Sequence, residues 1–172
     1  MKLLTRHSGN RQHSSHTAPD RSGAAMMECA ITLPVLLIMV LGILEIGSAL
    51  RASTILQSAC RESGRLAAMD WRYIVADGQT PNEKLEQDLR NFVTASGLPG
   101  SDLTVNLVFA DGAQAGQVFD LSDEDNDLQM IRIEAVLPYS SVSVFPVRFL
   151  DGKSLKAFVI MRATMSSGTL TH

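Results

Sequence analysis

The longest hydrophobic run in the sequence lies at residues 24–50, where Glu28 and Glu45 are the only charged side chains. At about 1.5 Å per helical residue, the stretch from residue 29 to residue 50 extends for roughly 33 Å, which is about the thickness of a bilayer's hydrocarbon core. Only a helix satisfies its own backbone hydrogen bonds in lipid. The run therefore predicts a transmembrane helix over residues 24–50.

The helical period of apolar side chains continues beyond this run, over residues 51–75. Apolar or small side chains recur three or four positions apart and form one stripe, made of Ala52, Ile55 or Leu56, Ala59, Cys60, Ser63, Leu66, Ala67 and Ile74. The opposite side is polar and basic. This pattern predicts an amphipathic extension of the helix, whose stripe packs against another element. We interpret the basic side as a solvated face, and leave open that it contacts a partner.

Two further patterns predict the outer part of the fold. Residues 82–95 carry apolar side chains at helical spacing between Pro81 and Gly97, which predicts a short helix. From residue 102 to residue 166 the apolar period changes to two, as in strands with one buried side. The strands expected from this alternation cover residues 103–109, 131–137 and 157–165.

Asp111-Gly112 and Asp151-Gly152 are hairpin-type turn signals between these strands. Residues 140–150 are apolar but irregular, and we expect either an extra edge strand or a loop that covers the sheet. A small antiparallel sheet laid on the amphipathic part of the long helix buries both apolar faces. The predicted fold class is therefore α+β, with a long N-terminal membrane and amphipathic helix packed on a small antiparallel β-sheet.

Charge is distributed unevenly along the chain. Residues 1–22 carry four basic side chains against Asp20, whereas residues 51–172 carry more acidic than basic side chains. Positive flanks remain in the cytoplasm, so we expect a cytoplasmic N-terminus and an extracytoplasmic domain at residues 51–172. An acidic outer domain lacks the basic footprint of a nucleic-acid-binding protein.

Glu28 stands at the start of the hydrophobic run, where a carboxylate costs about 2.5–3.5 kcal/mol on insertion scales unless something neutralises it. Cleavage of the chain after Gly23 would create an α-amino group at Ala24, one helical turn from Glu28. That ammonium group could pair with Glu28 of the same chain or of a neighbouring helix. We therefore interpret residues 1–23 as a basic leader that a peptidase removes.

The string Gly23-Ala-Ala-Met-Met-Glu28 resembles the leader-peptidase site of type IV-like prepilins. Over residues 21–70, the string from Gly23 to Pro34, then Gly-Ile-Leu-Glu45-Ile-Gly and the pattern from Ala59 to Ala68, resembles the TadE-like minor pilins of tight-adherence (Flp pilus) systems. Cys29 departs from the family, which usually has an aromatic or bulky aliphatic residue at that position.

The resemblance implies a type IV pilin-like fold and a minor pilin, or pseudopilin, in the bacterial inner membrane, with incorporation into a surface pilus for adhesion left open. It also implies four kinds of protein partner: a prepilin peptidase, the pilus assembly platform of the secretion system, the major pilin and a second minor pilin. Membrane lipid surrounds the apolar helix. In this interpretation Ala24 and Glu28 set the register between packed helices.

Other positions in the apolar run have two interpretations each. Pro34 removes one helical hydrogen bond and should kink the helix, either as a tolerated proline or as a functional bend. Gly42 and Gly47 allow close helix contacts, although small residues are common in membrane helices. We interpret Glu45 as an acid that extends into the outer headgroups, and leave open a contact with another subunit or the platform.

Candidate catalytic or metal chemistry is sparse. Asp123, Asp125 and Asp127 follow the first positions of an EF-hand loop, but Leu128 stands where that loop needs glycine. We interpret the cluster as a solvated acidic loop and leave weak calcium binding open. The sequence has no phosphate loop, no metal-spaced His/Cys set and no nucleophile elbow, so we expect neither an enzyme nor a cofactor. Cys29 and Cys60 are roughly 46 Å apart along a continuous helix, too far for a disulfide within one chain.

Two alternatives remain beside the pilin interpretation. The first is an uncleaved single-pass anchor that displays an extracytoplasmic binding module. The second is a secreted enzyme or inhibitor, because Gly47-Ser48-Ala49 weakly resembles the small-x-small site of the general signal peptidase. The N-terminal residue of the mature protein separates all three.

Overall fold

The computed structural model describes residues 21–69, 75–76, 78–145 and 152–163. It forms two units, residues 1–41 and 42–172, and helix α1 (Arg21–Ala67) contributes to both. The remaining elements belong to the second unit. They are α2 (Pro81–Ala95), η2 (Gly100–Asp102), β1 (Thr104–Phe109), η3 (Glu124–Asn126), β2 (Met130–Pro138), η4 (Tyr139–Ser141) and β3 (Ser154–Arg162).

In the first unit, α1 is apolar on all sides and exposed on all sides. Every side chain from residue 23 to residue 40 is exposed, including large ones such as Ile31 and Ile38. Among the described residues, α1 is the one helix long and apolar enough to cross a membrane. A helix that is hydrophobic all round requires a nonaqueous surrounding, and a bilayer provides one.

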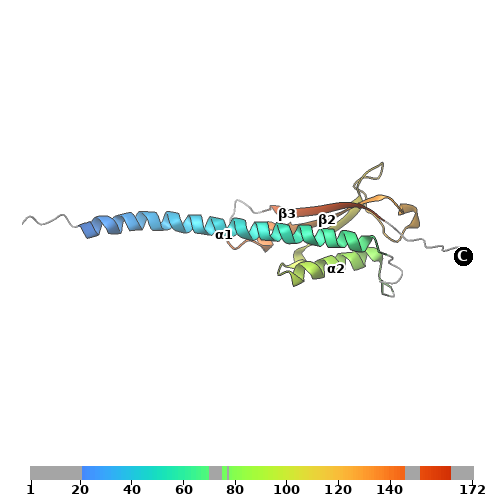
Figure 1. The fold of residues 1–172 in the computed structure, drawn as a ribbon, viewed down its shortest axis with the longest axis horizontal. Coiled ribbons are helices and arrows are strands. Elements are labelled where there is room, and N and C mark those ends of the chain that lie inside the picture. Colours follow the sequence, from blue (N-terminus) through green and yellow to red (C-terminus); the bar gives the residue numbers. More distant parts are fainter. Residues whose placement is uncertain (1–20, 70–74, 77, 146–151, 164–172) are drawn as a thin grey trace, which may run out of the picture. The chain divides into compact units, whose positions relative to one another are not determined.

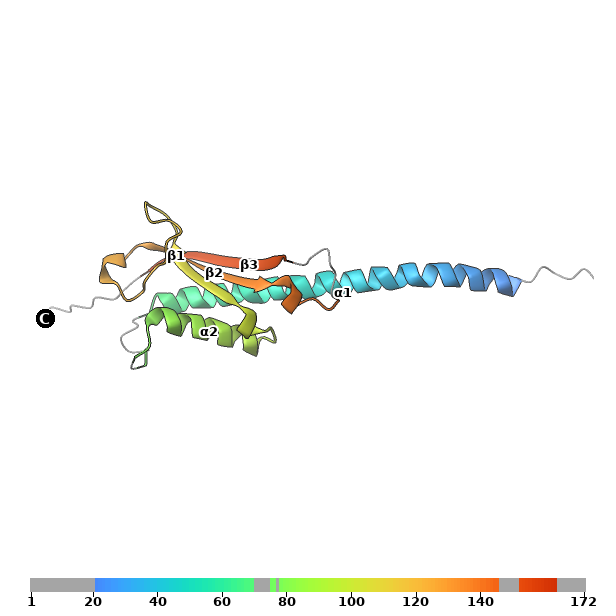
Figure 2. The ribbon, with the colours of Figure 1, turned by 180° about the vertical axis from the view of Figure 1, so that it is seen from behind.

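The second unit is a two-layer arrangement of helices on an antiparallel sheet. The strand order is β1-β2-β3, so β2 is central, with Ile133 opposite Leu107 of β1 and Val159 of β3. The second half of α1 and all of α2 lie side by side against one face of this sheet (Figure 1, Figure 2). The predicted α+β class, with a long N-terminal helix on a small antiparallel sheet, is confirmed.

Strict alternation on β2 forms the centre of the core. Its inward side chains are fully buried and belong to one cluster with Leu56 and Cys60 of α1 and Leu85 and Leu89 of α2. These inward residues of β2 are Ile131, Ile133, Ala135 and Leu137. The outward side chains of β2 are only partly buried, apart from Pro138, which is exposed, as expected for a sheet with one solvated face.

Gly64 of α1 marks a close approach between the helix and β3. A Cβ atom at this position would lie 3.0 Å from the sulfur of Met161 and 3.4 Å from Cγ1 of Val159. The contact with Met161 is tighter than normal and the contact with Val159 is an ordinary one, so a side chain at Gly64 would have to displace the Met161 side chain of β3 slightly. Packing within the chain is therefore one reason for glycine here.

Helix α2 begins at a capping box. The Thr80 hydroxyl accepts from the Glu83 amide, and the Glu83 carboxylate accepts from the Thr80 amide, which satisfies two otherwise unpaired donors. Asn82 then links the first turn of α2 to a distant loop. Its amide nitrogen donates to the Phe119 carbonyl (2.7 Å) and its oxygen accepts from the Leu121 amide (2.9 Å).

The structure changes several predicted boundaries. Helix α1 ends at Ala67, before the predicted residue 75, although residues 70–74 lie outside the described part. Strand β3 begins at Ser154 and ends at Arg162, earlier than the predicted 157–165, because it pairs with β2 along its whole length. Residues 140–145 form η4 and a turn, and the rest of the irregular segment falls outside the described residues, as does Asp151.

The Asp111-Gly112 turn does not join β1 to β2. It folds the chain back onto the free edge of β1, where Val118 forms a bridge with Val108 and the Phe119 amide donates to the Leu107 carbonyl. The chain then continues through η3 before β2 starts at Met130. The sequence correctly predicted a turn at Gly112, whose φ is 76°. It did not predict that the chain after this turn pairs with β1.

Candidate functional site

The candidate cleavage and register residues lie together at the start of α1. Gly23, Ala24 and Glu28 are all exposed, and Ala24 and Glu28 are four residues apart, so they share one side of the helix. Within the described residues, no side chain donates to the Glu28 carboxylate. Its backbone carbonyl accepts from the Thr32 hydroxyl at 2.9 Å.

Pro34, Gly42 and Gly47 also lie within α1. The helix continues through Pro34 and on to Ala67, and the kink remains a prediction. A Cβ atom at Gly42 or Gly47 would have no other atom within 4 Å, so neither glycine is explained by packing inside the described chain. Both therefore leave small, exposed surfaces on the helix.

Glu45 is the one acid of the apolar run that the folded chain covers. Its side chain is only 6% exposed and accepts four hydrogen bonds from the turn that follows β2. These donors are the Tyr139 hydroxyl (2.7 Å), the Ser143 hydroxyl (2.6 Å), the Val144 amide (3.0 Å) and the Phe145 amide (3.2 Å). The arrangement joins α1 to a segment about one hundred residues away in sequence. We call Glu45 and residues 139–145 the Glu45 clamp.

Comparison with protein families finds a match that covers nearly the whole of helix α1. Residues 23–65 match the family described as TadE-like protein. The chain carries a TadE-like segment. The family suggests involvement in Tad pilus systems and is a pilus-associated structural family not known as enzymatic. No curated protein and no solved structure matches the chain.

The TadE-like segment covers residues 23–65, so it contains both the candidate cleavage site and the Glu45 carboxylate. Within this segment, the side chains change from fully exposed to buried at regular intervals. No side chain from residue 23 to residue 40 is covered, whereas from Glu45 onward burial recurs at Ala52, Leu56 and Ala59. The one-sided stripe of the second unit therefore starts at Glu45, inside the run predicted to cross the membrane.

Sequence reasoning did not find the Glu45 clamp. Both interpretations of Glu45 directed its carboxylate away from the chain's own outer domain, to headgroups or to another protein. A signal was available, because Glu45 stands seven residues before Ala52 and so lies in phase with the buried stripe. Tyr139 and Ser143 carried no such signal, since nothing local in sequence relates them to α1.

The clamp perturbs Tyr139. Burial, the hydrogen bond to Glu45 and the nearby carboxylate charge together raise the pKa of Tyr139 to about 12, from 10.0. Unfolded Tyr139 loses its proton near the ordinary value while folded Tyr139 keeps it. Its contribution to the free energy of unfolding is therefore complete below pH 10 and falls as the pH rises toward 12.

Glu45→Gln should lower the pKa of Tyr139 part of the way back toward 10, because burial remains while the carboxylate is removed. Absorbance titration near 295 nm measures this in a Tyr73→Phe background, which leaves one tyrosine. Glu62→Gln is the matched control and should leave the titration unchanged, because Glu62 is an exposed acid of α1 that pairs with Arg65 among the described residues. An unchanged pKa of Tyr139 in the Glu45→Gln variant would show that the Glu45 carboxylate does not affect the Tyr139 hydroxyl.

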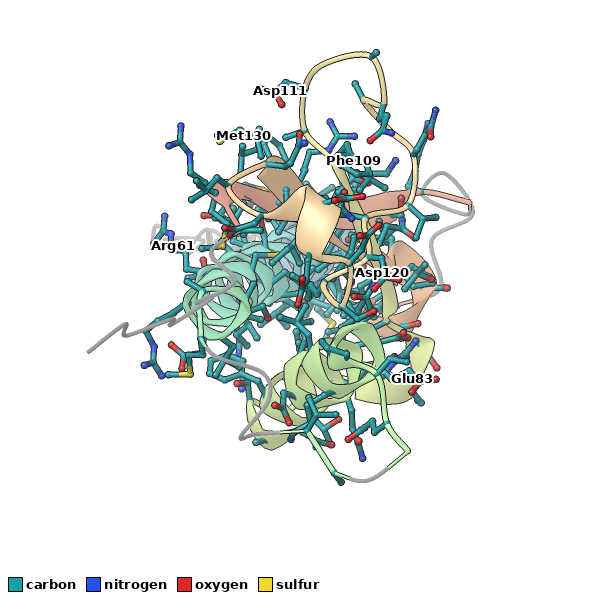
Figure 3. The ribbon with its side chains drawn as sticks, turned by 90° about the vertical axis from the view of Figure 1, so that its right-hand side faces the viewer. Arg61, Glu83, Phe109, Asp111, Asp120 and Met130 are labelled. Atoms are coloured by element: carbon teal, nitrogen blue, oxygen red, sulfur yellow. The ribbon has the colours of Figure 1, made fainter. Side chains whose placement is uncertain are left out.

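The acidic loop lies at the end of the second unit where β2 begins, near the labelled Asp120 and Met130 (Figure 3). The Asp123 carboxylate caps η3 by accepting from the Asp125 amide, and Asp127 accepts from the Leu128 amide. In the part of the chain that the structure describes, no three His, Cys, Asp or Glu side chains are grouped to hold a metal ion.

The two cysteines have different surroundings. Cys29 is exposed in the apolar part of α1, and Cys60 is fully buried in the core. Burial raises the pKa of the Cys60 thiol to about 11, so the reactive thiolate is scarce at neutral pH. Cys60 acts as a small apolar side chain of the stripe.

Proposed function

We propose that this chain is a minor pilin, or pseudopilin, of a tight-adherence (Flp) pilus, processed by a prepilin peptidase between Gly23 and Ala24. The observation that carries the proposal is the TadE-like match, which starts at Gly23 and leads directly into a helix exposed and apolar on all sides. A helix of that kind is suited to move from lipid into a bundle of similar helices.

The proposed role of Glu28 is to set the axial register between neighbouring helices. Cleavage gives Ala24 a free ammonium group on the same side of α1 as the exposed Glu28 carboxylate. Pairing offsets part of the cost of holding the carboxylate in an apolar surrounding, and the pair can form within one subunit or between two. When subunits pack, an unpaired ammonium or carboxylate is unfavourable, so one axial offset between neighbouring helices is preferred.

The proposed location follows from charge and hydropathy. The basic residues before α1 favour a cytoplasmic N-terminus in the bacterial inner membrane, with the second unit on the outer side. The assembly platform, the major pilin and a second minor pilin are the proposed partners. Gly42 and Gly47 would let their helices approach closely, and a bend at Pro34 would adapt the helix to the packed fibre.

Glu28→Ala tests the register role. The variant should be cleaved at the same bond as the wild type, yet appear several-fold less in sheared fibres, because the Ala24 ammonium lacks its partner. Immunoblots of sheared and membrane fractions measure the distribution, and the intact mass of the membrane form reports cleavage. Glu62→Ala, which removes an exposed acid farther along α1, is the control and should assemble normally. Wild-type amounts of Glu28→Ala in the fibre would remove the register mechanism.

A further inference from the structure

The turn that holds Glu45 exposes two large apolar side chains. Val144 is 53% exposed and Phe145 is 38% exposed, although their backbone amides are both bound to the Glu45 carboxylate. The polar groups of the turn therefore point toward α1, while its apolar side chains face outward. This is the arrangement of a segment that can enter an apolar surrounding without leaving its amides unpaired.

Exposed apolar surface on α1 adjoins the clamp in the same unit. Ile46, next to Glu45, and Leu50, about one turn farther along, are both more than half exposed. Arg51 follows and is exposed. Along the helix axis, the order is thus the exposed apolar run up to Leu44, the clamp with its two apolar side chains, the exposed Ile46 and Leu50, and then a cation. That order matches the sequence of acyl chains, interface and phosphate groups in a bilayer.

The length of the helix also places the clamp near the outer interface of the bilayer. From Ala24 to Glu45 is about 32 Å at 1.5 Å per residue, close to the thickness of the hydrocarbon core. The clamp therefore attaches its turn to α1 near the outer end of the predicted span, about 8 Å before Leu50 at 1.5 Å per residue.

We propose that Val144 and Phe145 insert into the outer interface of the bilayer that α1 crosses, and that the Glu45 clamp holds them there. The partner is the lipid at the boundary of headgroups and acyl chains. The inference rests on the proposed membrane location of α1 and adds to it a second contact, which fixes how deeply the helix sits. Glu45 acts as a positioning residue, because it orients the turn and does not itself face the lipid.

Single-tryptophan variants of the full chain test this in a Trp71→Phe background, since Trp71 is the one native tryptophan. The protein is placed in phosphatidylcholine vesicles that contain phosphatidylcholine brominated at carbons 6 and 7 of one acyl chain. Phe145→Trp fluorescence should be quenched by bromine, at least two-fold more than that of Val118→Trp. Val118 is the matched control because it is 78% exposed and lies beside the start of β2, whereas the clamp follows its end.

Ile38→Trp reports separately on the membrane span. Quenching of Ile38→Trp together with quenching of Phe145→Trp supports the inference, and adding Glu45→Gln should then reduce the Phe145→Trp signal. Quenching of Ile38→Trp while Phe145→Trp behaves like Val118→Trp overturns the inference and leaves the span intact. An unquenched Ile38→Trp contradicts the membrane location itself. A further outcome also overturns the lipid contact. In it, bromine does not quench Phe145→Trp fluorescence, and the emission shifts to shorter wavelength as the protein-to-lipid ratio rises. That result would assign the turn to contacts between copies of the chain.

Discussion

Gly23→Leu is expected to abolish processing, so that the whole population keeps the mass of the unprocessed chain. A peptidase must hold the extended backbone on both sides of the bond it cuts, and a branched side chain at the proposed scissile residue fills the space that glycine leaves. The fold offers no other reason why Gly23→Leu should prevent processing. A Cβ atom at Gly23 meets no other atom within 4 Å, so the substitution disturbs no packing in the described chain.

The measurement is the intact mass of the protein extracted from membranes of its own host. Gly47→Leu is the matched control, since Gly47 is also an exposed glycine of α1 with open space around it. It should be cleaved like the wild type, although its assembly can change. A Gly23→Leu protein that still loses residues 1–23 would place the cleavage elsewhere.

Gly100→Ala should lower the free energy of unfolding of the second unit by about 1–3 kcal/mol, the usual range for overpacking a well-packed site. Gly100 is buried at the start of η2, directly against α2. A Cβ atom there would overlap the Thr94 hydroxyl and the Arg90 carbonyl oxygen. Because the carbonyl belongs to the backbone of α2, it cannot move without displacing the helix.

The same shift would strain the bond in which Arg90 Nη1 donates to the Gly100 carbonyl at 3.0 Å. Urea unfolding of the detergent-solubilised chain, followed by circular dichroism, gives the change in midpoint. Gly47→Ala makes the same chemical change at an open helical position and should be neutral or slightly stabilising, because alanine favours helix over glycine. Equal midpoints for Gly100→Ala and Gly47→Ala would contradict the packing described for η2.

Local pattern was enough to predict the elements that dominate this fold. The uninterrupted apolar run predicted the first part of α1, and three–four spacing from Ala52 to Ala67 predicted its buried stripe. On β2, alternation of Ile131 and Ile133 with Arg132 and Glu134 predicted which side chains face the core. These features depend only on the period of the backbone, which the sequence expresses directly.

Contacts between distant segments could not be predicted in the same way. The reason for glycine at position 100 lies in the position of α2, whose atoms a Cβ atom at Gly100 would overlap. Glu45 was assigned to lipid headgroups or another subunit, because its donors lie on a turn near residue 140 that no local rule brings to α1. The Asp111-Gly112 signal likewise identified a turn and not the strand edge to which the chain returns.

The central claim is that proteolysis between Gly23 and Ala24 gives the membrane helix an ammonium group beside Glu28. The most direct test is N-terminal sequencing, with intact mass, of the wild-type protein recovered from a host with active prepilin peptidase. We predict a polypeptide that begins at Ala24. A protein that retains residues 1–23 would contradict it and favour the uncleaved anchor, and one that begins at Leu50 would favour the secreted form.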